Sequence, residues 1–432
     1  MDVSSAIASI GIFLITYGLI FSERVHRTIA AMAGAIAMIA VGIGLGFYDW
    51  ETAVAAIDFN TIGLLLGMMI IVGILQKTGF FQYMAIVVAQ GTRGNPRWLF
   101  LSLAGFTALV STVLDNVTTI VMVAPVTVSI AEVVGISAMP LLIAEAVCSN
   151  VGGVATLVGD PPNILIGSAA GLSFNDFLSH LGPVVVVTLL LSFGLLRLLF
   201  RHELSAPPER VESLMAIEAR RALVDPKIMR RMLTVVGLTV VLYLIHDLLH
   251  LPPGLVALIG ASLGLLWVRP KVEEVLSQIH WDVLLFFISL FIVVGGLETA
   301  GVLSWISTHL GFLAHSGMLL AALAILWVSA LMSAVVDNIP FTIAMLPVIK
   351  GLGGQGVATG PLWWALALGV GFGGNATPIG ATANVVAVSV SERTDEPITV
   401  HHWMRSGTWL ALLGCGVGSL AIYLGVKFGW LL

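Results

Sequence analysis

The sequence has little charge. Only 10% of its 432 residues are Asp, Glu, Lys or Arg, whereas about a quarter of a soluble globular domain is usually charged. The mean hydropathy is +1.04, and apolar runs long enough to cross a membrane recur along the chain. Continuous runs of this kind indicate a polytopic helical membrane protein, whereas a transmembrane barrel would show short alternating segments.

Cysteine is scarce as well, and the common catalytic motifs are missing. The two cysteines, Cys148 and Cys415, are too few for a disulfide scaffold or a thiolate metal cage. The sequence has no Ser-His-Asp order, no His-Glu-x-x-His motif, no Gly-Lys-Ser or Gly-Lys-Thr phosphate loop, and no nucleic-acid patch. We therefore expect neither an enzyme nor an ATP-driven pump formed by this chain alone, and no cofactor or metal site.

Hydropathy predicts an all-α protein. We place membrane spans at 3–22, 28–47, 60–79, 140–170, 181–200, 231–250, 254–269, 282–300, 361–392 and 407–430. Two further apolar stretches, 97–135 and 317–350, each carry an Asp-Asn pair near the middle. We interpret both as re-entrant hairpins, because non-helical backbone is tolerated at membrane depth only where it is buried in protein or lines a cavity.

The basic residues predict the topology. The one long polar segment, 201–230, is interpreted as a cytoplasmic linker, with the N-terminus outside. Of the 19 Lys and Arg residues, only Lys350 and Lys427 then lie outside, and the other 17 (19 − 2) lie inside. We therefore expect an integral, multi-pass protein of the cell (inner) membrane.

The two halves of the chain are related. Asp115-Asn116 matches Asp337-Asn338 at a separation of 222 residues, and "GGVATLVGDPPN" from Gly152 matches "GGNATPIGATAN" from Gly373 at 221. Each half has five spans, an odd number, so the halves run in opposite directions. We predict an N-terminal repeat at 1–200 and a C-terminal repeat at 231–432, the inverted architecture of secondary transporters.

The hairpin tips are the first candidate site. A charged side chain at membrane depth costs at least ~2.5–3.5 kcal/mol, so Asp115 and Asp337 need a reason to be there. One interpretation is a polar cavity in which both carboxylates bind a proton or cation while Asn116 and Asn338 bind a solute. The alternative is a helix cap, in which the side chains accept hydrogen bonds from free backbone N–H groups.

The segments 140–170 and 361–392 are the second candidate site. Each carries glycine and proline inside an apolar run, so each should unwind and expose carbonyls and helix N-termini to an ion or solute. The alternative is a glycine-packed helix crossing. The polar side chains that we single out here are Asn150, Thr156, Asp160, Asn163, Asn375, Thr377 and Asn384. Glu145 and Cys148 are secondary candidates, for titration and for contact with a thiophilic solute.

Four motifs carry a family resemblance: "LDNVTTIVMVAPVT", "NVGGVATLVGDPPN", "VDNIPFTIAMLPV" and "GGNATPIGATANVV". They resemble the ion transporter superfamily, in the branch of the melanosomal P protein and the ArsB arsenite efflux permeases. The resemblance implies two inverted repeats, a scaffold, and a mobile transport part that holds both hairpins and both broken spans. Relatives with Ser-Asn-Thr at the hairpin tips carry sodium and carboxylates, whereas this chain has Asp-Asn at both tips.

The resemblance and the charges together lead to a functional prediction. Two aspartates without a nearby Arg or Lys would repel a di- or tricarboxylate. We therefore expect a secondary transporter that exports arsenite or antimonite in exchange for protons, with Asp115 and Asp337 as the proton carriers. A sodium/proton antiporter, an anion transporter and a passive channel stay open. The expected partners are a small inorganic solute, a coupling ion (H⁺ or Na⁺) and membrane lipid. By family analogy a homodimer is a further candidate, and a separate ATPase subunit stays open.

Overall fold

The structure, a computed structural model, describes residues 3–22, 24–205, 211–306, 309 and 317–430. In these ranges every regular element is helical, which confirms the all-α prediction. The N-terminal half contains α1 (Val3–Phe21), α2 (Arg27–Leu45), α3 (Trp50–Ala55), α4 (Phe59–Lys77), α5 (Phe80–Gly91), α6 (Pro96–Ser111), α7 (Asn116–Val134), α8 (Met139–Gly153), α9 (Pro161–Ala170), α10 (Phe174–His180) and α11 (Gly182–Leu199). The C-terminal half contains α12 (Val211–Ala216), α13 (Pro226–Ile245), α14 (Pro253–Val268), α15 (Val272–Leu276), α16 (Trp281–Thr299), α18 (Met318–Val335), α19 (Asn338–Gly353), α20 (Gly360–Gly373), α21 (Thr382–Ser391) and α22 (Val400–Phe428).

Among the described residues, nine helices are long and apolar enough to cross a membrane: α1, α2, α4, α7, α11, α13, α16, α18 and α22. These helices leave many large apolar side chains exposed, such as Leu14, Leu190 and Leu238. Exposed apolar surface on this scale suits lipid rather than water as the surrounding solvent.

The predicted hairpins and broken spans are interrupted where the sequence motifs lie. Residues 112–115 separate α6 from α7, and residues 336–337 separate α18 from α19. Residues 154–160 separate α8 from α9, and the second broken span unwinds between α20 and α21, where a single 3-10 turn covers Gly374–Ala376.

Some boundaries differ from those predicted. Helix α13 begins at Pro226, inside the predicted linker 201–230, because Asp225 caps it by accepting from the backbone N–H groups of Lys227 and Ile228. Helix α22 begins at residue 400 rather than 407, where Thr399 supplies the cap. The short helices α3, α5, α10, α12 and α15 were not predicted, since hydropathy detects spans and not the short helices between them.

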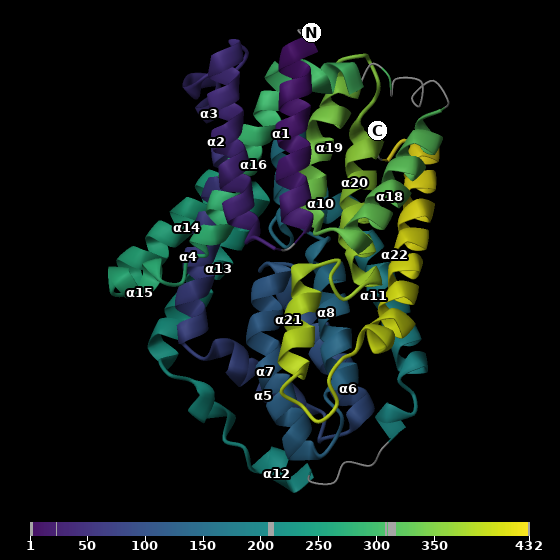
Figure 1. The fold of residues 1–432 in the computed structure, drawn as a ribbon. Helices are drawn as coiled ribbons and strands as arrows, with labels where there is room; N and C mark the ends of the chain where they lie inside the picture. Colours follow the sequence, from purple (N-terminus) through teal and green to yellow (C-terminus); the bar gives the residue numbers. More distant parts are fainter. Residues whose placement is uncertain (1–2, 23, 206–210, 307–308, 310–316, 431–432) are drawn as a thin grey trace.

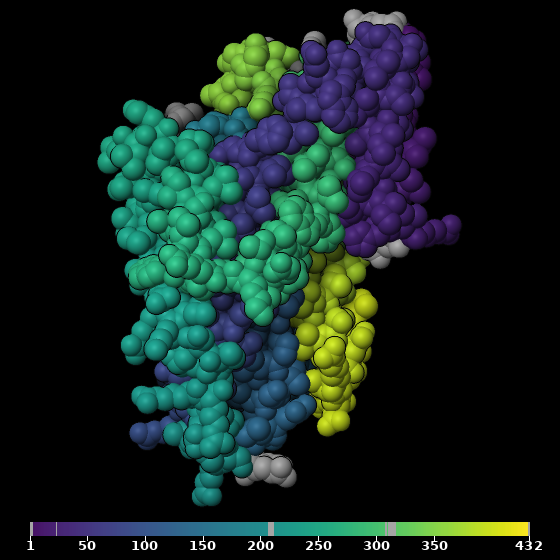
Figure 2. Space-filling view, turned by 90° about the vertical axis from the view of Figure 1, so that its left-hand side faces the viewer, coloured from purple at the N-terminus to yellow at the C-terminus, as the bar shows by residue number. Residues whose placement is uncertain are grey.

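The helices form two groups (Figure 1). In the first, which we call the scaffold, α1 packs on α2, α2 on α16, α4 on α14, and α13 on α14. In the second, which we call the hairpin unit, α6 packs on α8, α18 on α20, α7 on α21, and α9 on α19. In Figure 1 the α6–α7 pair lies in the lower half and the α18–α19 pair in the upper half, so their connecting turns face each other near mid-height. Figure 2 shows α1 and α2, in purple, ending well above the lowest part of the molecule.

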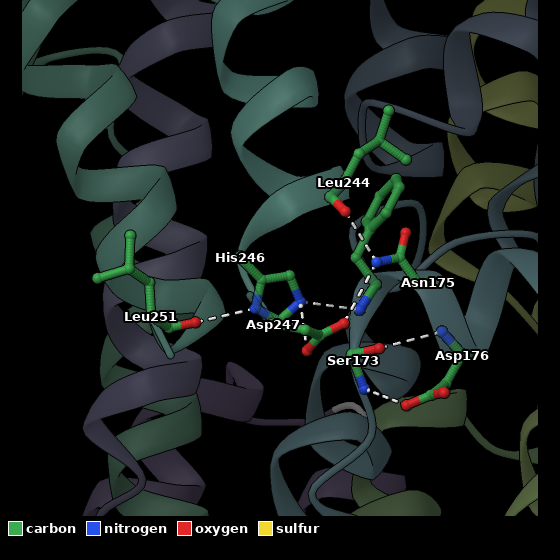
Figure 3. Close-up of polar contacts among 8 residues, drawn as sticks. Ser173, Asn175, Asp176, Leu244, His246, Asp247 and Leu251 are labelled. Carbon is green, nitrogen blue, oxygen red and sulfur yellow. Dashed lines mark hydrogen bonds and ion pairs between the residues drawn. The ribbon is translucent and has the colours of Figure 1, made fainter. Parts of the chain in front are cut away.

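Polar contacts join the start of α10 to the scaffold (Figure 3). The backbone N–H of Phe174 donates to Nε2 of His246 at 3.2 Å, so Nδ1 carries the ring proton and donates to the carbonyl of Leu251 at 2.9 Å. The side-chain amide of Asn175 donates to the carboxylate of Asp247 at 3.2 Å. These bonds fasten the connector that follows the first broken span to the turn between α13 and α14.

Glycines set two close helix crossings. A Cβ atom on Gly152 would collide with the carbonyl oxygen of Ala108, and one on Gly373 would collide with backbone atoms of Ala330. The first crossing joins α6 to α8, and the second joins α18 to α20. The helix-crossing interpretation of the glycines therefore holds at these two positions, next to segments that also unwind.

We expect Gly152→Ala to destabilise the protein, because the added methyl group meets backbone that cannot move without displacing α6. A clash of this kind costs about 1–3 kcal/mol, which would lower the melting temperature in detergent by several degrees. The matched control is Gly237→Ala on α13, where a Cβ finds open space. Equal melting temperatures for the two variants would contradict the close crossing.

Candidate functional site

Asp160 lies where both hairpins meet. It occupies the end of the first break, immediately before α9, and is 2% exposed. Its Oδ1 accepts from Nδ2 of Asn116, and its Oδ2 accepts from Nδ2 of Asn338, both at 3.4 Å. The two asparagines begin α7 and α19, so each hairpin tip contacts one oxygen of a single carboxylate. No Lys or Arg forms an ion pair with Asp160 among the described residues.

A network of asparagines extends from this point into both broken spans. Nδ2 of Asn150 donates to Oδ1 of Asn375 and to Oδ1 of Asn384, both at 2.8 Å. Oδ1 of Asn150 accepts from Asn116 at 3.1 Å. All four side chains are buried, and Nδ2 of Asn375 has no hydrogen-bond partner in the described part of the chain. An unpaired buried donor is costly, and this amide has room in its bonding for one further acceptor.

Four of the predicted residues, Asn384 among them, hold the unwound segments in place. The side-chain amide of Asn163 donates to three carbonyls in and beside its own break at 2.9–3.3 Å, and that of Asn384 donates to two at 2.8 and 3.0 Å. The hydroxyl groups of Thr156 and Thr377 each donate to a backbone carbonyl of the neighbouring hairpin at 2.5 Å. The two breaks therefore share the same pattern of hydrogen bonds, and these contacts hold the unwound backbone in its conformation.

We expect Asn163→Ala to lower the melting temperature more than Cys148→Ser does. Alanine removes the donor to three buried carbonyls, and each unpaired buried polar group costs about 1–3 kcal/mol. Serine at 148 replaces a fully buried thiol with a group of similar size. Differential scanning fluorimetry of both variants in one detergent measures the order. The reverse order would show that Asn163 does not hold the break.

The two tip aspartates differ in their surroundings. Oδ1 of Asp115 accepts from the backbone N–H of Thr118 at 2.8 Å and caps α7, as the helix-cap alternative predicts. Asp337 makes no cap bond. Its Oδ2 accepts from Nη1 of Arg27 at 2.6 Å and from the hydroxyl of Thr382 at 3.1 Å. Matched sequence positions thus have different partners.

Arg27 corrects one sequence argument. We expected no Lys or Arg near either hairpin tip, yet Arg27 forms an ion pair with Asp337, 310 residues away in sequence. Its guanidinium also lies 5.4 Å from the ring centroid of Phe286 on α16. The sequence placed Arg27 only at a span end, and no local pattern joins the start of α2 to the second hairpin. The premise that no basic side chain lies near either tip is therefore wrong at Asp337, and a carboxylate substrate has one guanidinium to bind.

Two cavities lie beside Arg27, between the scaffold and the hairpin unit. One, of about 240 Å³, is lined by Asp115 and His280 among others. The other, of about 400 Å³, is lined by Asp337 and other residues. Arg27 lines both cavities, as do Asp282 and Thr382. A small solute bound there would contact one guanidinium, hydroxyl groups and the tip carboxylates.

The secondary candidates lie apart from this cluster. Glu145 is fully buried in α8, where its Oε1 accepts from the hydroxyl of Thr127 at 2.6 Å. Cys148 is also fully buried. In the described ranges no hydrogen bond connects either side chain to Asp160.

The charges of the site favour a cation. Asp160, in the first break, accepts hydrogen bonds from Asn116 and Asn338, whose immediate neighbours are Asp115 and Asp337. One carboxylate of the break and two of the hairpin tips therefore belong to this site. Arg27 is the one basic residue that forms an ion pair with any of them in the described part of the chain. Carboxylate, amide and carbonyl oxygens are suitable ligands for a hard cation, and a carboxylate alone can take up a proton.

The fold and these buried polar sites at interrupted helices define a membrane transporter. The chain belongs to the CitMHS citrate transporter family, whose model matches residues 17–369. It is 41% identical to a 46 kDa membrane protein of Mycobacterium leprae, with 97% of this chain and 98% of that protein aligned. It is 32% identical to the human P protein over 96% of this chain and 59% of the P protein. The predicted superfamily and its P protein branch are thus confirmed.

Two solved structures share the fold. The YdaH transporter of Alcanivorax borkumensis aligns with a TM-score of 0.63 at 14% identity, covering 94% of this chain and 99% of that one. MtrF of Neisseria gonorrhoeae, described with a class of antimetabolite efflux pumps, aligns with a TM-score of 0.61 at 12% identity, covering 90% of this chain and 84% of its own. At these identities the likeness concerns the fold alone.

Proposed function

We propose that this chain is a cation-coupled secondary transporter and that Asp160 binds the coupling ion, H⁺ or Na⁺. The observation that supports this most strongly is the position of Asp160, a buried carboxylate without an ion-pair partner among the described residues, contacted by one asparagine from each hairpin tip. Asp115 and Asp337, the carriers predicted from sequence, are already used in a helix cap and an ion pair. Asp160 is therefore the better candidate.

We infer transport by alternating access, and the two groups of helices support this inference. Paired contacts support the inverted repeats: α4 packs on α14 as α16 packs on α2, and α7 packs on α21 as α19 packs on α9. In this proposal the scaffold stays fixed while the hairpin unit moves and carries Asp160 between the two faces of the membrane. The Arg27–Asp337 ion pair, which joins the two groups, would open and close during this movement.

For the substrate, we infer a small carboxylate anion bound at Arg27. The family description names citrate, and Arg27 supplies the guanidinium that a carboxylate pairs with best. Arsenite is the second candidate, because the unpaired Nδ2 of Asn375 and the neighbouring amides suit a neutral solute with several hydroxyl groups. Export of arsenite in exchange for protons stays a prediction, as do sodium/proton antiport and an anion pathway.

Proteoliposomes with a trapped pH-sensitive dye can separate these candidates. Citrate, arsenite and Na⁺ are added one at a time, with no other gradient imposed. Proton movement with citrate supports the proposed substrate, and movement with arsenite alone selects the second candidate. Movement with Na⁺ alone identifies a cation antiporter. Conductance without saturable exchange would overturn the proposal of a secondary transporter in favour of a channel.

A further inference from the structure

A groove between the start of α6 and the end of α11 contains three arginines. Arg97 at the start of α6, Arg197 near the end of α11 and Arg201 just beyond it line an open groove of about 490 Å³, together with His202 and Ser205. Nη2 of Arg97 donates to the hydroxyl of Ser205 at 3.3 Å, and Nε of Arg201 donates to Nε2 of His202 at 3.3 Å. None of the three arginines forms an ion pair with a described acidic residue. The groove thus holds three positive charges with no counterion from the described chain.

The helix next to this groove faces outward with apolar side chains. Leu190, Leu191 and Leu198 on α11 are 65%, 48% and 61% exposed. Trp98, which follows Arg97, is 63% exposed, and tryptophan is enriched where a membrane meets water. The arginine groove therefore lies at the end of an apolar stripe that acyl chains can cover.

We propose that this groove binds the phosphate headgroup of an anionic membrane lipid, whose acyl chains lie along α11. Arginine pairs with phosphate through two parallel N–H···O bonds, and basic pockets between membrane helices are known to hold such headgroups. The apolar stripe favours a lipid over free phosphate, which has no acyl chains to place there. The groove contains none of the residues of the proposed transport site, so this inference is independent of the transported solute.

The test is lipid binding by the full-length protein in neutral detergent. Native mass spectrometry measures bound phosphatidylglycerol, with phosphatidylcholine and inorganic phosphate as separate arms. The test variant is Arg97→Gln/Arg197→Gln/Arg201→Gln. The matched control is Arg24→Gln/Arg220→Gln/Arg230→Gln, which removes the same charge from exposed arginines predicted to lie on the same side of the membrane. Melting temperatures without lipid check that both variants are folded.

We expect the dissociation constant for phosphatidylglycerol to rise at least about tenfold in the groove variant and to stay near wild type in the control. Wild-type protein should prefer phosphatidylglycerol to phosphatidylcholine. Equal loss in both variants would show general attraction to surface charge and would overturn the proposal. Competition by inorganic phosphate at the same concentration as the lipid would also overturn it, since the ligand would then be free phosphate. If the groove variant is unfolded, the single variants Arg201→Gln and Arg230→Gln replace the two triple variants. The dissociation constant for phosphatidylglycerol should then rise in Arg201→Gln and not in Arg230→Gln, and an equal rise in both would overturn the proposal.

Discussion

Asp160→Asn is expected to reduce ion-coupled transport strongly while leaving the protein folded. Asparagine has nearly the same shape, and its one oxygen can still accept from a tip asparagine. Asn338 can turn its amide to offer an oxygen to the new NH₂ group. What is lost is the negative charge that the coupling ion needs. A hydrogen bond or ligand contact to a charged group is worth about 1.5–3 kcal/mol, so coupled uptake in proteoliposomes should fall by roughly 10- to 100-fold.

Asp115→Asn is the matched control for this prediction. Asn caps a helix about as well as Asp does, so a residue that only caps α7 tolerates the change. We expect Asp115→Asn to keep both ion coupling and melting temperature, and any change to be confined to the affinity for a solute in the cavity that Asp115 lines. If Asp115→Asn abolishes coupling and Asp160→Asn does not, the tip aspartates are the carriers, as the sequence alone suggested, and the assignment to Asp160 is wrong.

Arg27→Gln is expected to raise KM for a carboxylate substrate about tenfold or more, because one charge-assisted pair is lost. Arg27→Lys should restore part of the affinity, since lysine keeps the charge but not the two-bond geometry. Transport of arsenite, which needs no countercharge, should change little. Initial rates of radiolabelled citrate and arsenite uptake measure both effects in one preparation.

Asp337→Asn separates substrate binding from structural support. In this structure the carboxylate of Asp337 forms an ion pair with Arg27. The neutral variant removes that partner and leaves the guanidinium free to bind the substrate, so KM for the carboxylate should fall or stay unchanged. A raised KM in Asp337→Asn, equal to that of Arg27→Gln, would indicate that the ion pair only holds the second hairpin in place. Melting temperatures of both variants identify any loss of folding.

The sequence predicts most of the fold because its signals are local. Apolar runs mark the spans, and Asp-Asn pairs and glycine with proline mark where helices break. Asn116 and Asn338 were predicted as a pair, and both contact Asp160. Comparison of the two repeats could not identify Asp160 as the leading carboxylate for ion binding, because Ala381 occupies the matching position of the second half. A carboxylate that occurs in only one repeat is a weaker candidate in such a comparison. In the structure, however, Asp160 is the carboxylate that the asparagines of both hairpin tips contact.

Other features depend on long-range packing, and no local pattern carries them. Arg27 follows an ordinary span end, so nothing in its neighbourhood indicates contact with a hairpin more than 300 residues away. Likewise Asp115 and Asp337 occupy matching sequence positions, yet one caps its helix and the other forms an ion pair. The two aspartates differ because Arg27 of the scaffold contacts only one of the two tips. The sequence similarity of the repeats gives no information on this contact.

Proton exchange by purified protein tests the central claim most directly. The protein is placed in weakly buffered detergent solution, and the protons released or taken up on adding Na⁺ or citrate are counted with a pH indicator. If Asp160 is the carboxylate that binds the coupling ion, wild type and Asp115→Asn should exchange protons to the same extent, and Asp160→Asn should exchange none. Undiminished proton exchange by a folded Asp160→Asn variant would contradict the account.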